Sequence, residues 1–353
     1  MRLIDLVYPK YKTISIVGTS KNAGKTVTMN QIIAEAEEKG ITLGLVSTGR
    51  DGERRDVLTN TEKPPVYACR GSIITTVENS LGNIAADERA GVEILEVTGY
   101  NTPMGKVVVG RVQDAGYVEI SGPRSSATIK HMCDMMRSVG AELVLVDGSL
   151  DRRASAAPFV SDGTVIAAGA SLSRSMEVVI QKTAHLIGVY SIPKVEESIL
   201  DMAEQAIENR ETVIIDEDGC CTVVGAQTSL NCGAAIAEQL SERSRYVILS
   251  GSATFDTLKD IVLSKKDKVQ IIVKDATRIF VNENELFMLN KMGMDIKVLD
   301  FINIIAVTVN PYSTEGYYFD PQEFLDRMRE AIRAIKPDIP VLDVMQNELQ
   351  DEI

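Results

Sequence analysis

Near the start of the chain, two short apolar runs are separated by a turn and then by a segment with the apolar spacing of a helix. Residues 13–17 form a β-branched apolar run that leads into a glycine-rich turn. Residues 26–39 carry apolar positions at helical spacing up to Gly40, and a second apolar run covers residues 43–47. This order predicts a βαβ unit, whose strands are parallel and buried on both faces.

Two further regions follow along the chain. Between residues 64 and 120, short apolar runs alternate with glycines and polar turns, which predicts an inserted or antiparallel β element. The pattern restarts after Pro193, and we therefore predict two domains, residues 1–190 and 191–353. The other predicted elements are helices at 129–139, 175–186, 196–208, 234–240 and 321–334, and strands at 143–146, 164–168, 212–215, 222–224, 246–249, 269–273 and 304–309.

The turn after the first predicted strand reads GTSKNAGKT, and we match it to the P-loop pattern G-x-x-x-x-G-K-[ST]. In a P-loop, glycines let backbone N–H groups curl around phosphate oxygens, and the helix N-terminus adds its positive dipole. Lys25 would neutralise charge on the β- and γ-phosphates, and the Thr26 hydroxyl would ligate Mg²⁺. The predicted nucleotide-binding residues are Gly18, Thr19, Ser20, Lys21, Asn22, Ala23, Gly24, Lys25, Thr26 and Val27.

A P-loop also needs an acidic residue on a neighbouring strand to hold the Mg²⁺ shell. Residues 143–148 read LVLVDG, so Asp147 ends an apolar strand and is our candidate for this role. We assign catalysis to Lys25 and Asp147 together. The alternative is a carboxylate that caps the following turn, because Asp-Gly is also a common turn sequence.

Two charged loops are candidates for further contacts with the nucleotide. The loop at residues 48–56 follows the second predicted strand, so it belongs to the same edge of the sheet as the phosphates. There Asp51 or Asp56 could complete the metal shell, or the whole run could be a solvated loop. In the cluster Asp151-Arg152-Arg153, an arginine could reach a γ-phosphate.

Composition narrows the choice of partners and compartment. The net charge of −13 disfavours nucleic acid and anionic membranes as partners. The five cysteines are odd in number and form no CxxC, so we interpret them as reduced, and we expect Cys220, Cys221 and Cys232 to be buried structural thiols. His131 and His185 lack the partners of a metal site. No apolar run approaches the roughly 18 residues of a membrane span, and we expect a soluble, cytoplasmic protein. An N-K-x-D guanine motif after an apolar strand is also lacking, which favours ATP.

The first half of the chain resembles the dethiobiotin synthetase-like group of P-loop proteins, through GTSKNAGKT, the acidic loop and the strand ending in Asp147-Gly148. In that group, metal is held by the P-loop threonine, an acid after the second strand and an acid ending a further strand. The matching positions here are Thr26, Asp56 and Asp147. The resemblance implies an α/β fold: a P-loop NTPase with a mostly parallel sheet and a β insertion over residues 1–190, followed by a second α/β domain over 191–353 of unknown partner or substrate role.

Over its whole length the chain resembles the P-loop subunits of reactivating factors for adenosylcobalamin-dependent lysine 5,6-aminomutases. The resemblance is carried by GTSKNAGKTVT, VDGSLDRRASA and VNPYSTEGYYFDPQEF. It implies an ATP-driven protein that acts with a larger companion reactivase subunit to remove damaged cobalamin from the aminomutase.

Two other readings stay open. One is an ATP-dependent small-molecule ligase or kinase of the dethiobiotin synthetase type, although Ser47-Thr48-Gly49-Arg50 stands where those enzymes carry Lys-Pro-Val. The other is a regulatory nucleotide-binding module without turnover. The oligomeric state is also open, a homodimer included.

Overall fold

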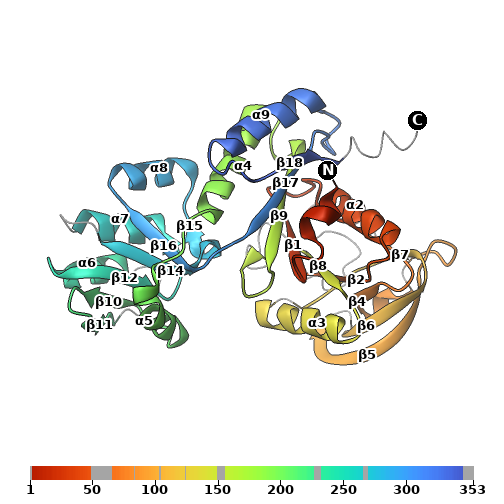
Figure 1. Cartoon of the computed structure of the whole chain (residues 1–353), viewed down its shortest axis with the longest axis horizontal. Helices are drawn as coiled ribbons and strands as arrows, with labels where there is room; N and C mark the ends of the chain where they lie inside the picture. The colour runs from red at the N-terminus through yellow and green to blue at the C-terminus, as the bar shows by residue number, and fades with distance from the viewer. Residues whose placement is uncertain are drawn as a thin grey trace. The chain divides into compact units, whose positions relative to one another are not determined.

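The structure is a computed structural model that describes residues 2–48, 66–82, 84–102, 105–123, 125–148, 156–225, 232–264 and 269–344 (Figure 1). It divides into two compact units: Met1–Thr183 with Asn303–Ile353, and Ala184–Ile302. This division differs from the boundary expected after residue 190. The segment from Asn303 onward joins the first unit because β17 (Ile304–Asn310) pairs in parallel with β9 (Gly163–Gly169).

A large, mostly parallel sheet forms the centre of the first unit. Its strand order is β18-β17-β9-β1-β8-β2-β4-β6-β5, and β1 lies between β9 and β8. The strands from β18 to β4 run parallel, whereas β6 is antiparallel to both β4 and β5. The antiparallel element expected between residues 64 and 120 is thereby confirmed. The other strands of the unit are β1 (Thr13–Gly18), β2 (Leu43–Ser47), β3 (Val66–Ala68), β4 (Ile73–Val77), β5 (Gly91–Thr102), β6 (Gly105–Asp114), β7 (Gly116–Val118), β8 (Leu143–Asp147) and β18 (Val341–Asp343).

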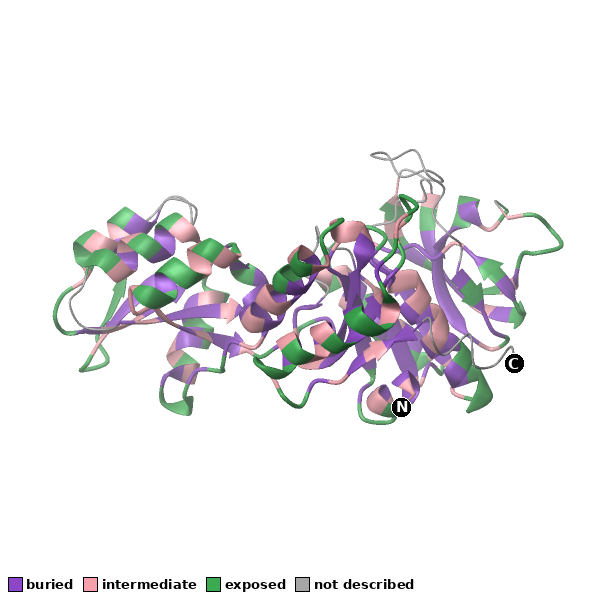
Figure 2. Ribbon diagram, turned by 90° about the horizontal axis from the view of Figure 1, so that it is seen from above, coloured by how far each residue is buried: buried purple, intermediate pink, exposed green. Residues whose placement is uncertain are grey.

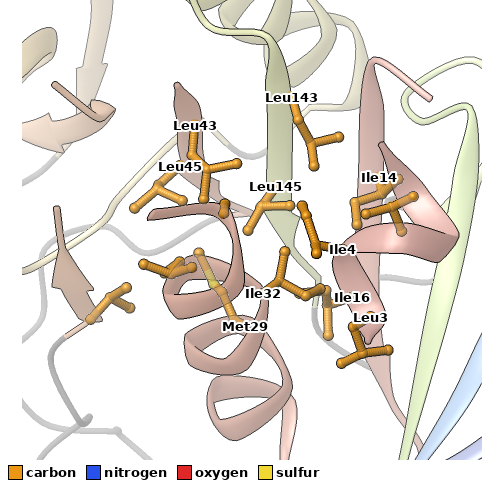
Figure 3. Close-up of a cluster of buried hydrophobic side chains, with 14 of the residues drawn as sticks. Leu3, Ile4, Ile14, Ile16, Met29, Ile32, Leu43, Leu45, Leu143 and Leu145 are labelled. Carbon is orange, nitrogen blue, oxygen red and sulfur yellow. The ribbon is translucent and has the colours of Figure 1, made fainter. Parts of the chain in front are cut away.

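Strand β8 shows how the sheet is covered on both faces. Successive side chains of a strand point to opposite faces, so Leu143 and Leu145 join one core cluster while Val144 and Val146 join another. Figure 3 shows Leu143 and Leu145 gathered with Ile4 and Ile32 in the first cluster. The helices of the unit are α1 (Leu3–Val7) and α2 (Lys25–Glu38) on this face, α3 (Ser126–Ser138) on the other, and α9 (Pro321–Arg333) and the start of α4 (Met176–Tyr190).

The second unit has its own five-stranded sheet, in the order β11-β10-β12-β14-β16. Strands β12, β14 and β16 run parallel, and β10 is antiparallel to β12. The core on one face is formed by Ile199 and Ala203 of α5 against Ile248 and Ile272. Figure 2 shows that the strands are mostly buried and that the helices expose their outer sides. The elements are α5 (Glu197–Glu208), β10 (Val213–Asp216), β11 (Cys221–Val223), α6 (Gly233–Gln239), β12 (Ser244–Leu249), β13 (Ala253–Thr254), α7 (Phe255–Ser264), β14 (Gln270–Asp275), β15 (Ile279–Phe280), α8 (Glu283–Lys291) and β16 (Asp295–Asp300).

The expected α/β class with a large, mostly parallel sheet and several helices is therefore confirmed. Among the described residues, no helix combines the length and the apolar character that crossing a bilayer requires.

Candidate nucleotide-binding site

The glycine-rich segment forms the connection between β1 and α2. Asn22 and Gly24 have positive φ angles of 58° and 99°, and Gly24 is the N-cap of α2. A Cβ atom on Gly24 would lie 2.9 Å from Cβ of Asn310, so glycine is required here by both backbone and space. The first hydrogen bond of the helix runs from Thr28 N–H to the Gly24 carbonyl. The N–H groups of the first turn have no acceptor within the helix, which makes its N-terminus suited to an anion.

The spacing of the glycines departs from the pattern to which the sequence was matched. Five residues, not four, separate Gly18 from Gly24, so the first glycine of the strict pattern would fall on Thr19. Even so, Lys25 folds back over the loop: a Cβ on Gly18 would lie 3.0 Å from the Lys25 Nζ and 2.9 Å from the Ser20 carbonyl oxygen. The ammonium group is therefore held at the loop, where it would meet a phosphate.

Two hydroxyl groups in the loop fit a ligand rich in acceptor atoms. Oγ1 of Thr19 and Oγ of Ser20 are buried and have no hydrogen-bond partner within the part of the chain that the structure describes. Burying an unsatisfied hydroxyl costs free energy, and a phosphate oxygen would satisfy it. The loop backbone is anchored next to them, because the Thr19 N–H donates to the Ala167 carbonyl of β9 at 2.8 Å.

Asp147 lies at the same edge of the sheet as the glycine-rich loop. It is paired with Ile16 of β1 on one side and with Ser47 of β2 on the other. The Ser47 hydroxyl donates to Oδ2 of Asp147 at 3.3 Å, and the N–H of Thr48 donates to the Asp147 carbonyl at 3.0 Å. Carboxyl ends of parallel strands share one edge, so Thr26, in the first turn of α2, and Asp147 belong to neighbouring connections there.

Metal binding at this edge would depend on few protein ligands. In the described ranges, no group of three or more His, Cys, Asp or Glu side chains could hold a metal ion. A nucleotide-bound Mg²⁺ does not need such a group, because it takes one or two carboxylates and fills its remaining positions with phosphate oxygens and water. The Thr26 hydroxyl and the Asp147 carboxylate fit that chemistry. Asp51, Asp56 and the cluster Asp151-Arg152-Arg153 lie outside the described residues.

Three residues that contact the glycine-rich loop were not among the residues predicted for the site. Ser171 follows β9 and its hydroxyl donates to the Asn22 carbonyl at 2.7 Å. Thr314 follows β17 and its hydroxyl accepts from Nδ2 of Asn22 at 3.3 Å. Asn310 ends β17 beside Gly24. Only Asn310 carried a local signal, as a polar residue that ends an apolar run just before Pro311.

Residues 18–28, which include the glycine-rich loop, contain no histidine or cysteine. The ring Nε2 of His185 lies 2.9 Å from the Val281 carbonyl oxygen, so this histidine has a structural hydrogen-bond partner. Cys69, Cys133 and Cys232 are buried, and burial raises the pKa of Cys69 and of Cys133 to about 12. Cys220 and Cys221 are exposed, contrary to our expectation of buried thiols, because they lie at the β10–β11 hairpin on the edge of the second sheet.

No protein-family model matches the chain, and no curated protein matches it.

Proposed function

We propose that the protein is a Mg²⁺-dependent ATPase whose nucleotide cycle acts on a partner enzyme. One observation supports this above all: the left-handed Gly24 opens α2 while Lys25 folds back over Gly18. A positive charge, helix N-terminal N–H groups that have no acceptor within the helix, and two hydroxyls without a partner among the described residues thus meet in one loop. This combination suits the phosphates of a nucleotide better than it suits a neutral or cationic ligand.

In this proposal, one set of residues binds the phosphates and another holds the metal ion. Lys25 and the N–H groups of the loop bind the β- and γ-phosphates and stabilise the charge that develops on them. Thr26 and Asp147 would hold Mg²⁺, which neutralises charge on the phosphate oxygens when bound. Ser47 keeps the Asp147 carboxylate oriented at the sheet edge. Asp56 is a second acidic candidate for the metal.

For the partner, we propose an adenosylcobalamin-dependent lysine 5,6-aminomutase that is reactivated together with a larger companion subunit. The sequence resemblance motivates this choice. Its first and last segments, residues 18–28 and 309–324, also contact each other through Asn22 and Thr314 and through Gly24 and Asn310. Two of the segments that carry the resemblance therefore lie against each other at the proposed phosphate site.

Recovery of an inactivated aminomutase tests the proposal. The chain, its companion subunit, Mg²⁺ and ATP are added to aminomutase that has lost turnover through damage to its cobalamin, and fresh cofactor is supplied. We expect recovery with ATP, and none with a non-hydrolysable analogue or with Lys25→Ala. Absence of ATP-dependent recovery would refute the reactivase assignment.

A binding experiment separates this function from a ligase or kinase. The protein is saturated with a non-hydrolysable ATP analogue and titrated calorimetrically with small carboxylic acids. A reactivating ATPase should give no saturable heat, whereas an enzyme of the dethiobiotin synthetase type should bind a defined acid.

A further inference from the structure

Asn22 stands at the turning point of the P-loop in a conformation that few side chains adopt. Its φ angle is 58°, in the left-handed region that asparagine tolerates better than most residues other than glycine. Two different loops hold it there. Ser171 donates to its backbone carbonyl at 2.7 Å, and its side-chain amide donates to Thr314 at 3.3 Å.

The loop that carries Ser171 is itself fixed against the P-loop. A Cβ on Gly169 would lie 2.7 Å from the Ala23 Cα, so the two backbones pack in direct contact. The next residue, Ala170, accepts a hydrogen bond from the Tyr317 hydroxyl at 2.6 Å. The Arg174 guanidinium lies 5.0 Å from the centre of the Tyr317 ring, which is within the range of a cation–π contact.

The C-terminal segment meets the P-loop and its helix at further positions. The hydroxyls of Thr28 and Thr308 share a buried hydrogen bond of 2.7 Å. Asn310 covers Gly24, and Thr314 reaches Asn22. Residues 308–314 therefore follow the loop from its helix to its turning point, and the loops after β9 and β17 support it together.

We propose that Asn22 is a positioning residue of the phosphate site, whose left-handed backbone is fixed by Ser171 and Thr314. The inference rests on the proposed nucleotide function. Fixing Asn22 sets the peptide planes of Ala23 and Gly24, and with them the direction of the N–H groups that follow. Donors aimed in advance stabilise phosphate charge without reorganisation. Asn22 itself need not touch the nucleotide.

The variants Ser171→Ala, Thr314→Ala and their combination remove the two hydrogen bonds, whereas Ser171→Thr and Thr314→Ser retain a hydroxyl. Ser138→Ala is a matched control, because the Ser138 hydroxyl also donates to a backbone carbonyl at 2.7 Å on an exposed surface, at the end of α3. Two measurements are made on each full-length protein: the rate of trypsin cleavage after the exposed Lys21 without nucleotide, and the affinity for Mg²⁺-ATP.

We expect Ser171→Ala and Thr314→Ala each to be cleaved after Lys21 about three to ten times faster than wild type, the size expected from one modest hydrogen bond, and their combination to be cleaved at least as fast. The affinity for ATP should fall by a similar factor, and Ser171→Thr, Thr314→Ser and Ser138→Ala should behave as wild type. Cleavage no faster than in Ser138→Ala would overturn the role of Asn22, whether or not ATP binds. Faster cleavage with unchanged ATP affinity would overturn it too.

The two measurements also separate this inference from the proposed function. If wild type bound no ATP while the alanine variants were cleaved faster, the restraint on Asn22 would stand and the nucleotide function would fall.

Discussion

The Ser47 hydroxyl donates a hydrogen bond to Oδ2 of Asp147 at 3.3 Å, and this contact joins the carboxyl ends of the adjacent parallel strands β2 and β8. Strand β1, which leads into the glycine-rich loop, lies on the other side of β8. Asp147 is therefore held between the connections that follow β1 and β2, where it can serve the proposed phosphate site.

Replacing Asp147 by asparagine keeps the size of the side chain and an oxygen for Ser47, but it removes the negative charge. We expect ATP to bind with moderately reduced affinity and turnover to fall about 100-fold, as when one group that stabilises transition-state charge is lost. Phosphate release at increasing Mg²⁺ concentrations measures this. Asp134→Asn is the control, because Asp134 is an exposed acid on α3 that pairs with Lys130. Equal turnover in the two variants would exclude Asp147 from the metal site.

Glycine 169 tests the close packing of the loop after β9 on the P-loop. In Gly169→Ala the added Cβ meets Ala23 backbone atoms at 2.7 to 2.9 Å, and we expect a loss of about 1–3 kcal/mol in stability together with weaker ATP binding. Gly188 lies inside α4, and a Cβ added there would meet nothing within 4 Å. We therefore expect Gly188→Ala to raise the stability by about 0.5–1 kcal/mol. Urea denaturation midpoints measure both. A Gly169→Ala protein as stable as wild type would contradict the packing.

The thiols should fall into two classes. At pH 8 we expect a thiol reagent to modify Cys220 and Cys221 in the folded protein and the three buried cysteines only after unfolding. Burial raises the pKa of Cys69 and of Cys133 to about 12, so the folded state favours their protonated form. Their effect on stability is therefore constant below the ordinary thiol pKa of about 8.5 and unfavourable as pH rises toward 12. Fast labelling of Cys133 in the native protein would contradict its burial.

The division into two units predicts which fragments fold. A fragment of residues 1–190 lacks β17 and β18, which exposes the edge of β9 and removes the contacts to Asn22, Gly24 and Thr28. We expect it to aggregate and not to bind ATP. A chain in which a flexible linker replaces residues 184–302 should retain ATP binding. Equal ATP affinity of fragment 1–190 and the full chain would show that the C-terminal segment is dispensable.

Local patterns predicted the strands, turn and helix around the glycine-rich loop, because the residues of each element indicate that element. Strand β16 was not predicted, because an aspartate stands at each of its ends and Lys297 interrupts its apolar positions. Helices α7 and α8 were not predicted either. Contacts between distant residues were beyond reach: Ser171 and Thr314 follow Asn22 by 149 and 292 residues. Their proximity arises from the strand order β17-β9-β1, which no local pattern specifies.

Calorimetric titration of wild type and Lys25→Ala with Mg²⁺-ATP is the most direct test of the nucleotide site. Lys12→Ala is the control, because Lys12 is an exposed lysine just before the opposite end of β1. We expect saturable binding by wild type and Lys12→Ala, and an affinity about 100-fold lower for Lys25→Ala, the size expected when a charged hydrogen-bond donor is lost. Absence of binding by wild type, or equal affinity in all three proteins, would contradict a phosphate site at the P-loop.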